Sequence, residues 1–137
     1  MKVAFLTAGG IAPCLSSAIA SLANNYYKRD CNISMIGYLH GYKGLLQGNS
    51  ISFDLDSLQN IEALYNFGGS LIGNSRVKLT NIDDCIKNDY IKRGENPLKV
   101  AADQLIKDNV SVLHTIGGDD TNTAAGELVE YLNKYNY

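Results

Sequence analysis

The stretch that decides the fold is VAFLTAGG, residues 3–10, an apolar run that ends at two glycines. Such a run is typical of a strand buried on both faces of a parallel sheet. Apolar residues then recur at the spacing of a helix: Leu15, Ala18, Ile19, Leu22, Ala23 and Tyr26. A second β-compatible run follows at residues 33–39. This order of strand, helix and strand predicts a βαβ unit.

The last third of the chain repeats the order of strand, glycine turn and helix. Asn96 followed by Pro97 predicts a helix start, because proline suits the first helical turn. Residues 110–116 have the composition of a strand, Gly117 and Gly118 of a turn, and residues 121–135 of a helix. Alternating strands and helices favour a layered α/β domain.

The middle of the chain gives weaker signals. We expect a loop at residues 40–44 and a short strand at residues 51–53. A helix capped by Asp56 or Ser57 should follow, and Asn81 should cap another short helix.

The composition limits the function classes. A length of 137 residues favours one domain, and 45% hydrophobic with 19% charged residues supports a packed core. The net charge is −2, with no basic block, which argues against nucleic acid or an anionic membrane as partner. No apolar stretch is long enough to span a bilayer.

The cysteines indicate a reducing compartment. The three of them, Cys14, Cys31 and Cys85, are scattered, without a CxxC pair. Because a disulfide framework needs pairs, we expect free thiols and a cytoplasmic location. Cys14 is expected to be a small packing residue.

Two glycine-rich turns follow predicted parallel strands, at residues 8–13 and 117–121. Parallel strands end at one edge of a sheet, where ligands bind. Glycine allows close approach of the backbone, and the helix that follows offers free N–H groups, a combination that suits phosphate. The alternative is that each glycine only makes a tight turn. Two such turns at one edge favour a site.

Asp119 and Asp120 indicate a ligand site more specifically than the glycine turns do. One aspartate at a helix start is usually a cap, but two exceed what capping needs. A carboxylate there suits Mg²⁺, which keeps waters and bridges to substrate phosphates. The second carboxylate would repel any further anionic group.

The remaining polar residues are harder to assign. Arg76 offers a rigid fork of donors for phosphate oxygens, and its spacing alone leaves ligand binding and a solvated loop equally open. For Lys78 we expect a solvated loop cation. His114, inside an apolar strand, is expected to be a satisfied core histidine.

Four motifs resemble segments of the phosphofructokinases, in the same order and with similar spacing. They are AGGIAPC at residues 8–14, GYKGLL at 41–46, GGSLIGNSRVKLTN at 68–81 and TIGGDDTNTAA at 115–125. The doubled aspartate resembles the pyrophosphate-dependent branch. The resemblance implies a three-layer Rossmann-like sandwich with a mainly parallel sheet.

The resemblance also implies roles for residues. Gly10 would contact pyrophosphate through its backbone, together with Gly118 and Thr121 of the later loop. Arg76 would bridge the phosphoryl group during transfer, as a catalytic residue.

Asp119 would bind Mg²⁺ in the same resemblance. Asp120 stands where ATP-using members typically carry glycine. Its carboxylate would occupy the place of the nucleotide's α-phosphate and select pyrophosphate.

The implied reaction is reversible, Mg²⁺-dependent transfer of a phosphoryl group from pyrophosphate to fructose 6-phosphate, giving fructose 1,6-bisphosphate in glycolysis. A TIDND-like segment with the catalytic base should follow the last helix. Residues 1–137 lack it, so we expect the N-terminal, donor-binding part of a longer homo-oligomeric enzyme, inactive by itself.

Two alternatives remain open. The first is a non-catalytic module that binds phosphate or a nucleotide, favoured by the missing base. The second is an ATP-dependent phosphofructokinase, against which Asp120 argues.

Overall fold

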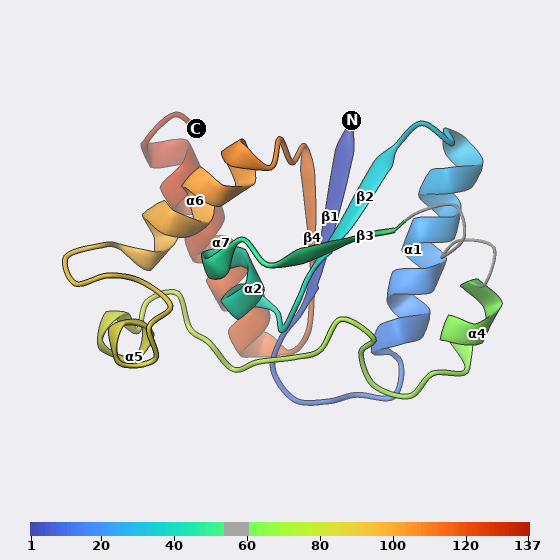
Figure 1. Cartoon of the computed structure of the whole chain (residues 1–137), viewed down its shortest axis with the longest axis horizontal. Helices are drawn as coiled ribbons and strands as arrows, with labels where there is room; N and C mark the ends of the chain where they lie inside the picture. Colours follow the sequence, from blue (N-terminus) through green and yellow to red (C-terminus); the bar gives the residue numbers. More distant parts are fainter. Residues whose placement is uncertain (54–60) are drawn as a thin grey trace.

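The sheet at the centre of the fold has four strands in the order β3-β2-β1-β4 (Figure 1). The computed structural model describes residues 1–53 and 61–137. The strands are β1 (Lys2–Thr7), β2 (Ser34–Tyr38), β3 (Ser50–Phe53) and β4 (Val112–Ile116). β1 pairs in parallel with β2 and β4, whereas β3 pairs antiparallel with β2. The predicted α/β fold with a mainly parallel sheet is therefore confirmed.

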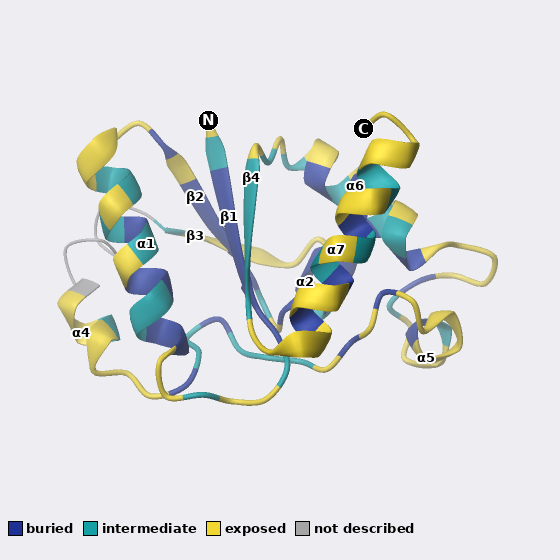
Figure 2. Cartoon of the chain, turned by 180° about the vertical axis from the view of Figure 1, so that it is seen from behind, coloured by how far each residue is buried: buried dark blue, intermediate teal, exposed yellow. Residues whose placement is uncertain are grey.

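The two faces of β1 supply two hydrophobic cores. Val3 and Phe5 pack on one face with the buried side of α1 (Leu15–Arg29), and Ala4 and Leu6 pack on the other. All four side chains are fully buried, because the side chains of a strand alternate between its faces and both faces are covered here. Figure 2 shows β1 as a buried strand, while the outer sides of the helices are exposed.

The helices complete the three layers. They are α1, α2 (Tyr42–Gln47), α4 (Ile61–Tyr65), α5 (Ile82–Lys87), α6 (Pro97–Lys107) and α7 (Asp119–Lys134). α1 and α4 lie on one side of the sheet, and α2, α6 and α7 lie on the other (Figure 1). No helix in residues 1–53 or 61–137 has the length and apolar character needed to cross a membrane.

Two predicted helix caps are confirmed. The side chain of Asn96 accepts a backbone N–H of α6 at 2.9 Å, and that of Asn81 accepts one of α5 at 3.2 Å. These bonds satisfy N–H groups that have no partner inside the helix. The predicted cap at Asp56 or Ser57 lies outside the described residues.

Some predicted boundaries are wrong. Residues 40–44 were expected to be a loop, but α2 begins at Tyr42, because its buried side chains pack on the sheet and override a glycine-rich sequence. Helix α7 begins at Asp119 and not at Thr121, since Gly118 is the N-cap. Strands β2 and β4 are each two residues shorter than their apolar runs.

Of the predictions for His114 and Cys14, the structure confirms the first and contradicts the second. The Nε2 atom of His114 lies 2.9 Å from the hydroxyl of Tyr26, and its ring stacks on Phe5, so the prediction of a satisfied histidine is confirmed. Burial lowers the pKa of His114 and favours its neutral form. Cys14 is exposed at the start of α1, so the prediction of a packing residue is wrong.

Gly41 brings α2 to the end of β1. Its φ is +66°, a left-handed backbone conformation that residues other than glycine rarely adopt. A Cβ atom at this position would lie 2.5 Å from the carbonyl oxygen of Thr7. A residue with a side chain would therefore be strained and would push α2 away from the sheet.

We predict that Gly41→Ala lowers the free energy of unfolding by roughly 2 kcal/mol, through strain and collision. Gly126→Ala is the matched control, because it lies in α7 and a Cβ there meets no atom within 4 Å. It should stabilise by about 0.5–1 kcal/mol, as alanine replaces glycine inside a helix. Urea unfolding measures both, and an unchanged Gly41→Ala midpoint would contradict the account.

Candidate functional site

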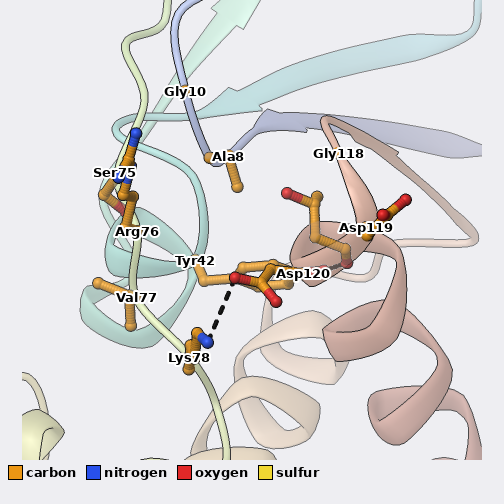
Figure 3. A pocket seen from close by; sticks show the side chains of 12 residues that line it. Ala8, Gly10, Tyr42, Ser75, Arg76, Val77, Lys78, Gly118, Asp119 and Asp120 are labelled. Atoms are coloured by element: carbon orange, nitrogen blue, oxygen red, sulfur yellow. Dashed lines mark hydrogen bonds and ion pairs between the residues drawn. The ribbon is translucent and has the colours of Figure 1, made fainter.

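A cavity of about 390 Å³ opens where β1 and β4 end (Figure 3). Three segments form its walls: the turn after β1, an extended segment before α5, and the start of α7. Tyr42 of α2 joins them. The lining residues are Ala8, Gly9, Gly10, Tyr42, Ser75, Arg76, Val77, Lys78, Gly118, Asp119, Asp120 and Thr121. All six predicted site residues are among them.

The parallel register of β1 and β4 brings the two glycine turns together. Thr7 is aligned with Ile116, and the N–H of Ala8 donates to the carbonyl of Ile116 at 3.0 Å. A side chain on Gly117 would collide with the carbonyl oxygen of Ala8. The two turns therefore face each other at one edge of the sheet, as the sequence predicted.

The segment that carries Arg76 is bound to the turn after β1 by hydrogen bonds. The N–H of Gly9 donates to the carbonyl of Ser75 at 2.9 Å, and the side-chain amide of Asn74 donates to the carbonyl of Gly10 at 3.3 Å. A Cβ on Gly10 would lie 3.7 Å from Nη2 of Arg76. The guanidinium of Arg76 thus lies beside the backbone of Gly10.

Residues 76–79 alternate between exposed and buried positions. Val77 and Leu79 are buried, whereas Arg76 and Lys78 are exposed. Since successive side chains of an extended segment point to opposite sides, both cations project toward the cavity. The pattern R-V-K-L could have revealed this from the sequence.

Lys78 forms an ion pair across the mouth of the cavity (Figure 3). Its Nζ lies 3.2 Å from Oδ2 of Asp120, although the two side chains are 58% and 78% exposed. The prediction of a solvated loop cation missed this contact. An exposed pair contributes little to stability, so its effect is on the charge that a ligand meets.

Asp119 and Asp120 occupy the first turn of α7, after the N-cap Gly118. Carboxylates are favoured there by the helix dipole and the free N–H groups. Among the described residues no three metal-ligating side chains lie together. A divalent cation would therefore need waters and ligand oxygens besides one carboxylate, which is the way Mg²⁺ is usually held with phosphates.

Tyr42 of α2 and Thr121 of α7 form the buried floor of the cavity. The hydroxyl of Tyr42 donates to the carbonyl of Thr121 at 2.8 Å, and both residues are at most 3% exposed. Burial raises the pKa of Tyr42, and the nearby carboxylate of Glu127 raises it further. Tyr42 is a cavity residue that the sequence did not indicate, because its partner lies 79 positions away.

The cavity can be summarised chemically. Two cations and two carboxylates surround a glycine-rich backbone with free N–H groups at a helix start. Such a set can bind a polyphosphate anion together with a divalent metal.

The chain is similar to several known proteins. A family model described as Phosphofructokinase matches residues 2–136. The chain is 60% identical over 136 residues to a pyrophosphate–fructose 6-phosphate 1-phosphotransferase of Methylotuvimicrobium alcaliphilum, covering 99% of the chain and 33% of that protein. It is 30% identical to an ATP-dependent 6-phosphofructokinase 2 of Streptomyces coelicolor, covering 93% of the chain and 33% of the relative.

Solved structures give the same fold. A pyrophosphate-dependent phosphofructokinase from Marinobacter aquaeolei superposes with a TM-score of 0.79 at 18% identity, covering 100% of the chain and 31% of that structure. One from Nitrosospira multiformis gives a TM-score of 0.81 at 14% identity, covering 99% and 31%. The chain spans about a third of the length of the relatives it matches.

Pyrophosphate is the test anion for this cavity, and we predict that Lys78→Met weakens its binding on the order of tenfold, because Asp120 then faces the anion without its counter-ion. Lys99→Met is the matched control: it removes the other described ion pair, with Asp103 at 2.6 Å, on α6 and outside the cavity lining. Titration calorimetry on the full-length protein measures both. Equal affinities of the two variants would show that Lys78 is only a surface charge.

Proposed function

The chain belongs to the phosphofructokinase family, and on this basis we propose that it transfers a phosphoryl group from pyrophosphate to fructose 6-phosphate as part of a longer enzyme. Residues 1–137 form the N-terminal, donor-binding part. The product is fructose 1,6-bisphosphate, in a reversible step of glycolysis. Relatives named pyrophosphate–fructose 6-phosphate 1-phosphotransferase that are 60% and 56% identical to the chain support the donor and the acceptor.

The observation that carries the proposal is the doubled aspartate in the donor cavity. Asp119 and Asp120 begin α7 on the wall opposite Arg76 and Lys78. A capping role would explain one carboxylate, but it would not explain a second one that forms an ion pair across the cavity mouth.

The backbone of the two turns holds the donor in this proposal. Gly10 offers its N–H to a phosphate oxygen, and its lack of a side chain leaves room beside Arg76. A Cβ atom placed on Gly118 would have no neighbouring atom within 4 Å, so the backbone there is open to a ligand. Thr121, which is buried, lines the floor of the cavity below the donor.

Arg76 acts on the phosphoryl group during transfer. Its planar fork can contact two oxygens of the moving group at once and offset the charge of the transition state. The hydrogen bonds of Asn74 and Ser75 to the turn after β1 hold the segment that carries it. Such positioning supplies most of the catalysis in phosphoryl transfer.

Asp119 is the proposed ligand of Mg²⁺. The metal, when bound, neutralises charge on the donor oxygens. A single carboxylate with room for waters and phosphate oxygens fits that chemistry.

Asp120 selects the donor by charge and volume. A nucleotide would place a further phosphate where its carboxylate stands, and like charges at short distance repel. Pyrophosphate is shorter than a nucleotide and does not extend to the place of this carboxylate. Lys78 offsets part of the negative charge of Asp120 that pyrophosphate meets.

The second candidate is an ATP-dependent phosphofructokinase, favoured by the 30% identity to such a relative. Asp120 argues against ATP as the donor for the reason just given.

A non-catalytic phosphate-binding module is the third candidate. We further propose a cytoplasmic location, in keeping with the free cysteines, and a homo-oligomeric full-length enzyme.

We predict that Asp119→Asn abolishes the dependence of pyrophosphate affinity on Mg²⁺, because an amide is a much weaker metal ligand than a carboxylate. Asp83→Asn is the control, since Asp83 is also an acidic residue in the first turn of a helix but lies outside the cavity. Calorimetry of the full-length protein with and without Mg²⁺ is the measurement. Metal dependence that survives in Asp119→Asn would disprove the assignment.

We predict that Asp120→Gly raises the ratio of kcat/KM for ATP over that for pyrophosphate, on the order of tenfold, through relief of repulsion. Asp120→Asn separates charge from volume, because it keeps the shape and removes the charge. Assays of the full-length enzyme with both donors at saturating Mg²⁺ give the ratios. An unchanged ratio, with both activities merely reduced, would make Asp120 a structural residue.

A further inference from the structure

Tyr42 links two elements of the cavity that are far apart in the sequence. It is the first residue of α2, its side chain is 1% exposed, and it lines the cavity (Figure 3). Its hydroxyl donates to the carbonyl oxygen of Thr121, in the first turn of α7, at 2.8 Å. A buried tyrosine hydroxyl needs a partner, and this backbone oxygen is the partner here.

The backbone fixes the place of this hydroxyl. Gly41, with its left-handed φ, turns the chain against the carbonyl of Thr7 directly before Tyr42. Leu45 and Leu46, also in α2, are buried on the same side of the sheet. The hydroxyl of Tyr42 is therefore held at a set position relative to the end of β1.

The acceptor belongs to the turn that carries the two carboxylates. Asp119, Asp120 and Thr121 are the first three residues of α7. A carbonyl has two lone pairs, so the oxygen of Thr121 can accept from Tyr42 in addition to an N–H within the helix. Since a helical turn moves as a unit, a shift of Thr121 also shifts both aspartates.

We propose that Tyr42 is a positioning residue for the phosphoryl donor, whose hydroxyl holds the first turn of α7 in place relative to Arg76 and Gly10. The inference deepens the proposed function and rests on it. Tyr42 touches neither donor nor metal in this role. It acts through Thr121 on the carboxylates that do.

The test compares Tyr42→Phe with Tyr38→Phe in the full-length protein. Tyr38 is the matched control: it is fully buried, and its hydroxyl donates one hydrogen bond, at 2.7 Å, to Asp108 beyond the end of α6, outside the cavity lining. Each variant loses one hydroxyl and one hydrogen bond, which is buried at Tyr42 and partly buried at Tyr38, so both variants should lose stability.

The kinetic result distinguishes positioning from stability. Tyr42→Phe should raise KM for pyrophosphate and the Mg²⁺ concentration for half-maximal activity, each by roughly threefold to tenfold, while KM for fructose 6-phosphate stays constant. Tyr38→Phe should leave all three constants unchanged. Equal constants for the two variants would overturn the inference.

A second measurement needs no donor. Hydrogen exchange of the ligand-free proteins should be faster at residues 122–125, whose amides are bonded in the first turns of α7, in Tyr42→Phe than in wild type or Tyr38→Phe, since the turn loses its tether. Unchanged exchange there would overturn the inference. Faster exchange with unchanged KM for pyrophosphate would also overturn it, because Tyr42 would then be structural only.

The outcomes separate this inference from the proposed function. If the wild-type enzyme uses ATP and not pyrophosphate, the donor assignment fails, and the same comparison of Tyr42→Phe with Tyr38→Phe on KM for ATP still decides the role of Tyr42. A wild-type protein that binds neither donor overturns both.

Discussion

The parallel pairing of β1 with β4 is the constraint on which the rest of the structure depends. It places the ends of two strands that are over a hundred residues apart at one edge, with Thr7 beside Ile116. Both strands then continue into glycine turns, because a side chain at Gly117 would strike the carbonyl of Ala8. A slip of the register would separate these turns and with them the walls of the cavity.

The extended segment before α5 completes the cavity from the other side. Thr7 anchors it, since its Oγ1 lies 2.6 Å from Oγ of Ser70 and donates to the carbonyl of Gly73 at 2.9 Å. Buried residues farther along, such as Leu79, hold the segment to the core. Its irregular backbone is thus fixed by the regular elements around it, as loops that carry binding residues commonly are.

The cavity carries charges of both signs. Asp120 would repel an anionic ligand, yet Lys78 stands 3.2 Å away and offsets this repulsion. Arg76 adds a second cation beside Gly10. The arrangement suits a short, highly charged anion that binds together with a cation. The anion would meet the two cationic side chains, and the cation would meet the carboxylates.

Local patterns in the sequence predicted most of the helices and strands and the two glycine turns that line the cavity. Helix caps such as Asn96, the buried strand β1 and the two glycine turns depend on neighbouring residues, so periodicity and turn chemistry reveal them. α2 was missed because its helix owes its stability to packing and not to propensity. Only the tertiary structure decided that Lys78 meets Asp120 and that Tyr42 meets Thr121, 79 positions away. Such contacts form only when the chain has folded, since no local rule specifies which distant residue a side chain will reach.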